Sequence, residues 1–439
     1  MLKPGAQKPL IELALQGAPT QQEVTTRALV RGGRLERAWR EFGCRSFYGY
    51  LDSEKGYCPW DEKPASALSR ADVFGERLQT EIRGAATYEL GDDVVWPDVY
   101  ETRLKAGRVV HLHGPFPSFV QRLFVDAATP LADAFLPLTV FSYRRGQDRL
   151  QALYVARRLG RSGLHWAVKL DVADFFGSVR NDQIIEVLGD PRLRLHASMR
   201  RLGVSFQAAN VFKLEGGWTP MTGCIYPGSV AGPLLANLVA AVKLDQPFRR
   251  SYGSKLGVVA LRYGDDILVL GSTKQDANHG RDLLEFLAGE AGWRLSDEKT
   301  MGGAVDLRET SVTFLGKSLR ASGVVTPQGM VDEFIDRIRS AEGDKRFGAT
   351  GSLVYELSLD SLERVDEIQG TLRGFNLGLE HGFERSRLRQ AERRRRRLAA
   401  AERILGKLSD NLGTKPRRQV GTKAAAGRPE PKSGLRRGV

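Results

Sequence analysis

The chain has 439 residues and a formal net charge of +14, with 66 Lys or Arg against 52 Asp or Glu. This length predicts two or three domains and ample chain to bury a core, because domains usually span roughly 100–200 residues. Hydrophobic residues make up 41% and charged residues 27% of the sequence, which excludes a fibrous or wholly disordered protein.

The positive charge is concentrated at the C-terminal end. Residues 383–439 contain 18 Lys or Arg and 5 Asp or Glu, which leaves the first 382 residues nearly neutral at +1. Basic tails usually contact phosphates or anionic surfaces, so we expect this segment to bind nucleic acid. A solvated charged helix followed by a disordered end is the alternative.

Cysteine, histidine and apolar patterns exclude several classes of protein. The three cysteines, Cys44, Cys58 and Cys224, form no CxxC pair, which argues against a zinc knuckle or disulfide framework and favours a reducing, cytoplasmic location. No apolar run reaches roughly 18 residues and the N-terminus lacks a long apolar stretch, so we expect no membrane partner and no signal peptide. His111 and His113 are interpreted as alternate residues of one strand rather than a metal site.

The expected elements follow one another without an internal repeat. Residues 1–100 mix helical stretches and loops. Periodicity and turn residues then predict a strand over 108–112 before the turn-like HGPFPS, a helix over 147–160, a buried strand over 166–171, and a helix over 181–188 capped by Asn181 or Asp182. Further on they predict a helix from Ser229 with Pro233 in its first turns, a hairpin from Val258, a helix over about 276–291, a strand over 312–319, helices over 331–342 and 353–380, and a charged helix over 391–408. Disorder is expected from about Ser409.

Acidic residues at two apolar strands carry the chemistry. Asp171 ends the strand in KLDVADFF, and Asp265 and Asp266 occupy the turn in RYGDDILVL. Burying carboxylates is costly unless cations pair with them. If the strands are neighbours, the acids form one anionic cluster that holds hard divalent ions. Two such ions about 3.5–4 Å apart activate a 3′-hydroxyl and stabilise a leaving pyrophosphate. By contrast, Asp92-Asp93 favours a loop or capping role.

Five segments around these acids share an order with a known family. They are LDVADFF (170–176), YPGSVAGPLLANLVAA (226–241), YGDD (263–266), GWRLSDEKT (292–300) and FLGKSL (314–319). In this order they resemble the first catalytic palm, palm helix, YxDD turn, lysine and primer-grip blocks of bacterial reverse transcriptases, the broad group of intron-encoded, CRISPR-associated, retron and phage-defence enzymes. FSYRRGQDRLQAL (141–153) and SGVVTPQGMVDEFIDRIR (322–339) extend the resemblance to roughly residues 100–345.

The resemblance implies an α+β, right-hand polymerase fold with fingers, a palm of antiparallel sheet plus helices, and a helical thumb. The corresponding boundaries are an N-terminal helical extension over 1–100, fingers over 101–165, palm over 166–320, thumb over 321–382, and a basic helix and disordered tail over 383–439.

The resemblance also implies the catalytic residues. Asp171 and Asp265 would ligate both metals, Asp266 would complete the acidic site, and the backbone carbonyl of Val172 could add a ligand. The implied cofactor is two Mg²⁺ ions, with Mn²⁺ as a substitute. Lys299 would protonate the leaving pyrophosphate; a surface cation is its alternative.

Other residues would contact nucleotide, primer or template. Phe176 would exclude a 2′-hydroxyl, Arg108 would bind the triphosphate, and Gly228 would lie at the nucleotide. The residues expected at the primer and template are Tyr263, Phe314, Leu315, Gly316, Arg393, Arg394, Arg395, Arg396 and Arg397. Core packing is an alternative for Phe175, Phe176, Phe314 and Leu315.

Two blocks depart from the family pattern. Tyr226-Pro227-Gly228 stands where the family usually has Pro-Gln-Gly, and Gly232 replaces its serine. Pro117-Ser118-Phe119 replaces the usual Asp-Arg pair before Val-Gln. These departures favour a specialised enzyme over processive copying of arbitrary RNA.

We therefore expect an RNA-directed DNA polymerase that copies a dedicated structured noncoding RNA in antiphage defence, with RNA, cDNA and dNTPs as partners. Intron-like, CRISPR-associated and retron contexts remain open. The alternatives are template-independent or protein-primed DNA synthesis, and a noncatalytic RNA-binding or splicing-helper protein. The sequence does not indicate an oligomeric state.

Overall fold

A four-stranded sheet forms the centre of the protein. The computed structural model describes residues 99–103, 109–113, 115–206, 209–213, 217–221, 223–252, 257–341, 343–374 and 395–408. The central sheet has the order β6-β7-β3-β8, with β3 (Trp166–Asp171), β6 (Val258–Tyr263), β7 (Asp266–Gly271) and β8 (Val305–Asp306). All of its strand pairs are antiparallel.

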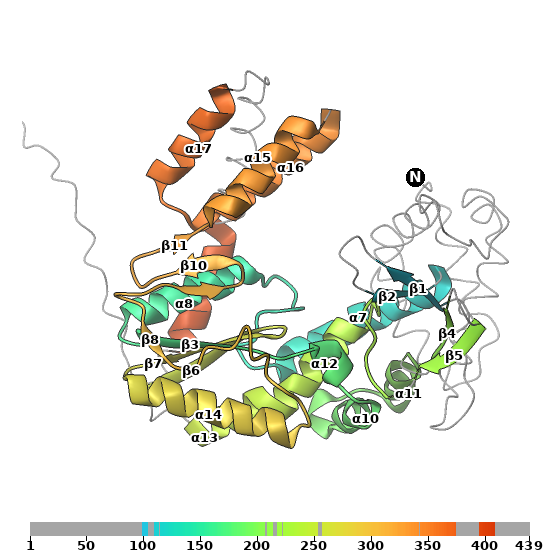
Figure 1. Ribbon diagram of the computed structural model, residues 1–439. Helices are drawn as coiled ribbons and strands as arrows, with labels where there is room; N and C mark the ends of the chain where they lie inside the picture. Colours follow the sequence, from blue (N-terminus) through green and yellow to red (C-terminus); the bar gives the residue numbers. More distant parts are fainter. Residues whose placement is uncertain are drawn as a thin grey trace, which may run out of the picture.

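Helices cover both faces of this sheet. The strands are apolar almost throughout, as expected for a sheet buried on both faces. α14 (Lys274–Glu290) packs against β3, β6 and β7 on one face and α8 (Arg149–Arg161) packs against β6 and β7 on the other (Figure 1). A continuous helical segment made of α12 (Gly232–Ala240), the π-helical turn η5 (Ala241–Asp245) and α13 (Gln246–Tyr252) lies on the α14 side.

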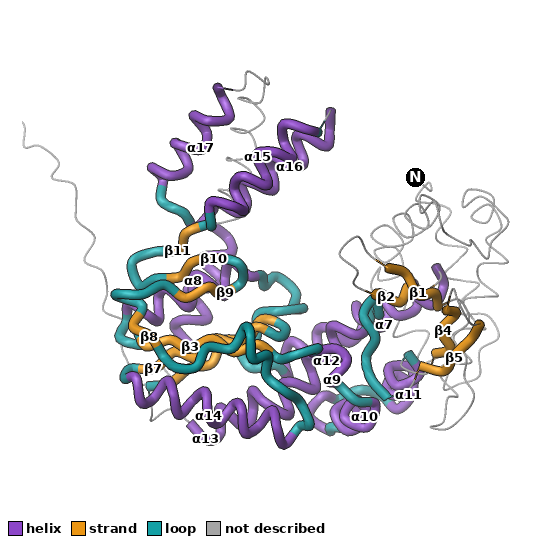
Figure 2. Tube along the Cα trace, in the orientation of Figure 1, coloured by secondary structure: helices purple, strands orange, loops and turns teal. Residues whose placement is uncertain are grey.

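A second sheet lies at one end of the molecule, with the order β2-β1-β4-β5 (Figure 2). Its strands are β1 (Val99–Arg103), β2 (Val109–His113), β4 (Ala209–Lys213) and β5 (Gly217–Met221). The long helix α7 (Pro115–Phe135) follows β2 and packs against α12. The short helices between β3 and β4 are α9 (Phe175–Ser178), α10 (Asn181–Gly189), η4 (Pro191–Leu193) and α11 (Ala197–Ser205).

A third, small sheet leads into a helical region at the other end. Its order is β11-β10-β9, with β9 (Val312–Phe314), β10 (Lys317–Leu319) and β11 (Val324–Val325). α15 (Gln328–Ser340), α16 (Gly343–Glu356), η6 (Leu357–Leu359) and α17 (Leu362–Gly374) follow and project away from the central sheet (Figure 1). Residues 395–408 form a helix whose apolar side chains join the core under α8.

The structure confirms the expected strand over 166–171 and the hairpin from Val258, and it corrects four local predictions. The segment HGPFPS is not a turn, because α7 begins at Pro115, and proline is favoured in the first turn of a helix. Residues 312–319 form two strands joined at Leu315 and Gly316, whose φ angles are 51° and 74°. The helix expected over 353–380 is interrupted by η6, and α10 is capped by Arg180 rather than Asn181 or Asp182.

Two expectations fall partly outside the described residues. Residues 1–98 of the N-terminal extension expected over 1–100 lie outside them, as does the disorder expected from about Ser409. Within the described part of the chain, no helix combines the length and apolar character needed to cross a membrane. In the same part, Cys224 is a free thiol.

Candidate active site

The three expected acids meet where β3 ends beside the β6–β7 hairpin. Asp171 lies directly across from Asp266 in the β3–β7 register, and Asp265 occupies the hairpin turn with Gly264. The Val172 amide donates to the Asp265 carbonyl over 3.2 Å, which ties the end of β3 to the turn. Gly264 has a φ of 68°, a conformation that favours glycine, so the glycine of YGDD is required by the turn itself.

A loop over residues 292–301 runs along the end of β3 and brings a lysine to the acids. The amides of Ser296 and Met301 donate to the carbonyls of Asp171 (2.8 Å) and Lys169 (2.9 Å). The Asp171 amide donates in turn to the Thr300 hydroxyl over 3.2 Å. These bonds fix the loop so that Nζ of Lys299 lies 3.3 Å from Oδ1 of Asp171.

Two lysines balance the negative charge of the cluster. Asp171 is buried at 4% exposure and pairs with Lys299, whereas Asp266 pairs with Lys169 over 2.8 Å. The Asp171 carboxylate raises the pKa of Lys299, mainly by direct Coulomb attraction. Asp265 lies at the exposed hairpin tip, yet loss of solvation around its carboxyl raises its pKa, and the charges of Asp171 and Asp266 add to the effect. Mutual repulsion of this kind indicates a site that attracts cations.

The chemistry of these donors fits a hard divalent cation. Carboxylate and backbone carbonyl oxygens are the ligands that Mg²⁺ prefers, and Val172 lies at the same strand end. In the described part of the chain, however, no three His, Cys, Asp or Glu side chains converge closely enough to form a ready-made metal site. The ion pairs of Lys169 and Lys299 occupy two of the three carboxylates, so a metal ion would have to displace them.

A row of aromatic rings lies beside the acids. Phe176 is half-buried, and its ring centroid lies 6.5 Å from Tyr143 and 5.6 Å from Phe175. Phe175 is buried and packs edge-on against Trp293 at 5.8 Å. Core packing therefore accounts for Phe175, whereas the half-buried Phe176 packs only partly against the same core, and its contact with nucleotide stays a prediction.

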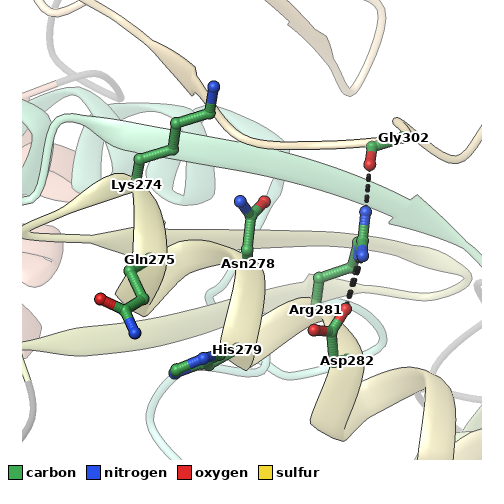
Figure 3. A pocket seen from close by; sticks show the side chains of 7 residues that line it. All are labelled: Lys274, Gln275, Asn278, His279, Arg281, Asp282 and Gly302. Atoms are coloured by element: carbon green, nitrogen blue, oxygen red, sulfur yellow. Dashed lines mark hydrogen bonds and ion pairs between the residues drawn. The ribbon is translucent and has the colours of Figure 1, made fainter.

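Hollows lie on α14 and beside Tyr143. One is a groove of about 570 Å³ beside Tyr143, between α7, the segment after Val140 and the start of α12, where Arg122, Arg144 and Arg145 line it. The other, of about 530 Å³, lies on α14 (Figure 3). Arg281 of that hollow is held by the Gly302 carbonyl and by Asp282, so its charge is already paired.

The expected primer residues divide into buried and partly exposed side chains. Phe314 is fully buried and Leu315 is 8% exposed, so core packing accounts for both side chains. Any primer contact at this turn would therefore come from its backbone, including that of Gly316. Tyr263 lies opposite Asp266 and is half-buried, and burial raises the pKa of its hydroxyl.

The altered block Tyr226-Pro227-Gly228 precedes α12 and contacts the second sheet. The His111 amide donates to the Pro227 carbonyl over 2.7 Å, and the His111 ring meets the buried Tyr226 ring edge-on at 5.9 Å. A Cβ on Gly228 would lie 2.1 Å from the His111 carbonyl oxygen. This glycine is thus required by a close backbone approach, whether or not it also contacts nucleotide.

The expected arginines are only partly described. Arg108, Arg393 and Arg394 lie outside the described residues. Arg395 and Arg396 are exposed, but Arg397 pairs with Asp148 over 2.8 Å. Its guanidinium also lies over the Tyr355 ring at 5.4 Å. Arg397 therefore holds its helix against α8 and α16, a role that the basic composition did not predict.

Sequence reasoning missed two residues of the site. Lys169 lies two residues before Asp171, so strand alternation puts both side chains on one face, and this spacing could have identified it. Tyr143 belongs to a segment that was recognised only as a family block, and no sequence signal marks its positive φ of 54°.

Acidic side chains thus cluster at adjacent strand ends, with the Lys299 side chain beside them. Residues 120–319 match the model of the reverse transcriptase (RNA-dependent DNA polymerase) family. These residues form a reverse transcriptase domain, which indicates an RNA-directed DNA polymerase, a nucleotidyltransferase. No curated protein matches the chain in a sequence comparison.

Proposed function

We propose that the protein adds dNTPs to a 3′-hydroxyl at Asp171, Asp265 and Asp266, with Mg²⁺ as the cofactor. The observation that carries this proposal is the register of β3 against β7, which sets Asp171 beside the Gly-Asp-Asp turn. Bound Mg²⁺ would supply activation of the hydroxyl and neutralisation of the pyrophosphate charge. Reverse transcriptases in general use divalent metal ions, and Mn²⁺ is the expected substitute.

The side chains around the acids have separable roles in this proposal. Lys299 donates a proton to the leaving pyrophosphate, since its 60% exposed side chain already reaches Asp171. Lys169 holds Asp266 until the cation binds. Phe176 presents its ring to the sugar of the incoming nucleotide, where bulk would exclude a 2′-hydroxyl.

The three regions of the fold correspond to the parts of a right-hand polymerase. We assign the central sheet with α8, α12 and α14 to the palm, the sheet β2-β1-β4-β5 with α7 to the fingers, and α15–α17 to the thumb. Two assignments differ from the sequence expectation. α8 lies within residues 101–165, which were expected to form the fingers, and β4 and β5 come from within residues 166–320, yet they pair with β1 in the fingers sheet.

The template is proposed to be a dedicated structured noncoding RNA, and the biological role to be antiphage defence. Support comes from the altered block at Tyr226-Pro227-Gly228, which contacts His111 instead of carrying the family glutamine. Untemplated or protein-primed synthesis is the second candidate, and it is favoured by the same loss. A noncatalytic RNA-binding role is disfavoured by the reverse transcriptase domain and its retained acids.

Primer extension by the purified protein with its co-purifying RNA tests the active site. Asp265→Ala combined with Asp266→Ala should reduce incorporation of dNTPs with Mg²⁺ by several orders of magnitude, because the acids act as a unit. Asp282→Ala, which removes an exposed acid on α14, is the matched control and should leave the rate unchanged. Normal synthesis by the double variant would exclude this active site.

Sequencing separates the remaining alternatives. A cDNA that matches the bound RNA supports templated synthesis, whereas homopolymeric or random product supports untemplated addition. If the bound RNA is a mixture without a dominant species, the proposal of a dedicated template fails. Phage plating on cells that express the protein, with the double variant as control, tests the defence role.

A further inference from the structure

Tyr143 has an unusual conformation for a residue beside an active site. Its φ is 54°, which a residue with a bulky side chain rarely adopts, and its side chain is 44% exposed. Backbone strain of this kind persists only where the surroundings impose it, and it is concentrated at functional sites. The strained backbone therefore raises the question of what the aromatic ring contributes at this position.

Both neighbours of Tyr143 are anchored. The Asn237 side-chain amide of α12 donates to the Ser142 carbonyl over 2.8 Å, and the Ser142 hydroxyl donates to Asn237 Oδ1 over 3.2 Å. On the other side, the Arg144 guanidinium donates to the carbonyls of Pro137 (2.7 Å) and Asp133 (2.8 Å). These buried bonds hold the segment rigidly, so the position of the Tyr143 ring is fixed by its neighbours.

The ring projects to the edge of the catalytic turn. The Tyr143 hydroxyl would lie 3.8 Å from a Cβ built on Gly264, so the ring lies next to the turn that carries Asp265. On its other side is the Phe176 ring, with an interplanar angle of 53°. Phe176 is thus flanked by Tyr143 and by Phe175, and Phe175 is braced in turn by the buried Trp293.

We propose that Tyr143 is a positioning residue for sugar selection: with Phe175 it fixes the Phe176 ring against the ribose position of the incoming nucleotide. The proposal rests on the proposed function and extends it to a residue that does not itself meet the sugar. A half-buried ring with no second wall would rotate away from a 2′-hydroxyl. Steric exclusion requires that the excluding group cannot yield.

The contact is made by the aromatic ring, so the two substitutions Tyr143→Phe and Tyr143→Leu separate the ring from the hydroxyl. Phe keeps the ring contact, whereas Leu removes the aromatic wall at similar hydrophobicity. Phe286 is 62% exposed on the outer face of α14, and Phe286→Leu is a matched loss of an exposed ring elsewhere.

The experiment measures kcat and KM for dGTP and for GTP in single-nucleotide extension. Tyr143→Leu should lower the preference for dGTP by about tenfold or more, through faster use of GTP. Tyr143→Phe and Phe286→Leu should keep the wild-type preference. In a Phe176→Ala background, where the preference is already lost, Tyr143→Leu should change nothing further.

Three results would overturn the proposal: an unchanged preference in Tyr143→Leu, an equal additional loss in the Phe176→Ala background, or a full preference in Phe176→Ala itself. Fluorine NMR of the full-length protein labelled with fluorophenylalanine provides a readout without catalysis. Tyr143→Leu should shift and broaden the Phe176 resonance. An unchanged resonance overturns the ring contact even if the protein proves inactive, which keeps this failure distinct from failure of the polymerase assignment.

Discussion

At the scale of single residues, Gly228 shows how a divergent motif is built into the fold. Its φ is 106°, and a Cβ there would lie 2.1 Å from the His111 carbonyl oxygen. We expect Gly228→Ala to lower the free energy of unfolding by about 1–3 kcal/mol, because both backbone strain and overlap oppose it. Urea denaturation measures the change.

The control for this substitution is Gly289→Ala near the end of α14. Nothing lies within 4 Å of a Cβ at Gly289, so alanine should be neutral or slightly stabilising in a helix. Equal stability of the Gly228→Ala and Gly289→Ala variants would show that the close approach to His111 is not formed in solution.

The role of Lys299 can be tested by substitutions that separate its positive charge from its ability to donate a proton. Lys299→Gln should lower kcat by about 10²-fold or more at unchanged KM for dNTP, because a general acid acts only in the transition state. Nζ of Lys299 lies 3.3 Å from Asp171. Lys299→Arg keeps a positive charge near Asp171, but the guanidinium holds its proton too tightly to donate it. Steady-state kinetics should therefore show that Arg restores little of the rate. Full recovery with Arg would assign Lys299 to charge neutralisation alone.

The catalytic acids could be predicted from the sequence because their information is local. An acid that ends an apolar strand and a Gly-Asp-Asp turn between two apolar runs predict both the strands and the meeting of the acids at one strand end, while their catalytic role stays a prediction. Their partner Lys169 follows the same period-two rule. Tyr143 could not be predicted, because its position depends on Asn237 and Asp133, which are distant in sequence and bind its two neighbours.

At the scale of elements, a buried polar network joins β10 to the helices that follow it. Nζ of Lys317, which is 1% exposed, lies 2.8 Å from Glu356 and donates to the Thr326 hydroxyl over 2.9 Å. Thr326 donates in turn to Asp360 over 2.7 Å, and Arg149 of α8 also pairs with Glu356. The network therefore links α8 and β10 to the end of α16 and to η6.

Burial of Lys317 gives this network a measurable pH dependence. Loss of solvation lowers the pKa of Lys317 from 10.5 to about 8. Between these values the unfolded chain binds the proton that the native protein has released, so stability should rise with pH from about 8 to 10.5. The gain relative to Lys317→Met, which cannot titrate, is on the order of 3 kcal/mol. Urea denaturation of both proteins across this range checks it, and parallel curves would contradict it.

Element boundaries could be predicted where the periodicity of apolar residues is strong. The prediction was wrong where a tight turn or a short irregular segment interrupts an element. The sequence pattern identified β3 and the β6–β7 hairpin, yet FLGKSL was interpreted as one strand. The positive φ angles of Leu315 and Gly316 fold it into two, and only the pairing of Phe314 with Lys317 reveals the turn. Similarly, the sequence shows no breaker strong enough to predict η6 between α16 and α17.

At the scale of the whole molecule, part of the C-terminal basic region packs against the rest of the protein. Ala401, Ile404, Leu405 and Leu408 lie in the same core cluster as α8, so residues 395–408 belong to the fold. Residues 409–439 carry 8 Lys or Arg and 2 Asp or Glu. The sequence predicted a charged helix over 391–408 within a basic segment over 383–439, but not that apolar side chains of this helix pack in the core.

Two truncations therefore have different expected results. Ending the chain after Leu408 should leave the melting temperature nearly unchanged but weaken RNA binding. The dependence of binding on salt should also become flatter, because each phosphate contact that is lost reduces the slope of log K against log salt by about 0.7–0.9. Ending it after residue 394 should lower the melting temperature as well, because it exposes the core under α8 and removes the Arg397–Asp148 pair. RNA binding measured from low to moderate salt, together with thermal denaturation, distinguishes the two. If the shorter truncation keeps the full salt slope, the phosphate contacts lie on the folded part of the protein, and the positive charge beyond Leu408 serves another partner.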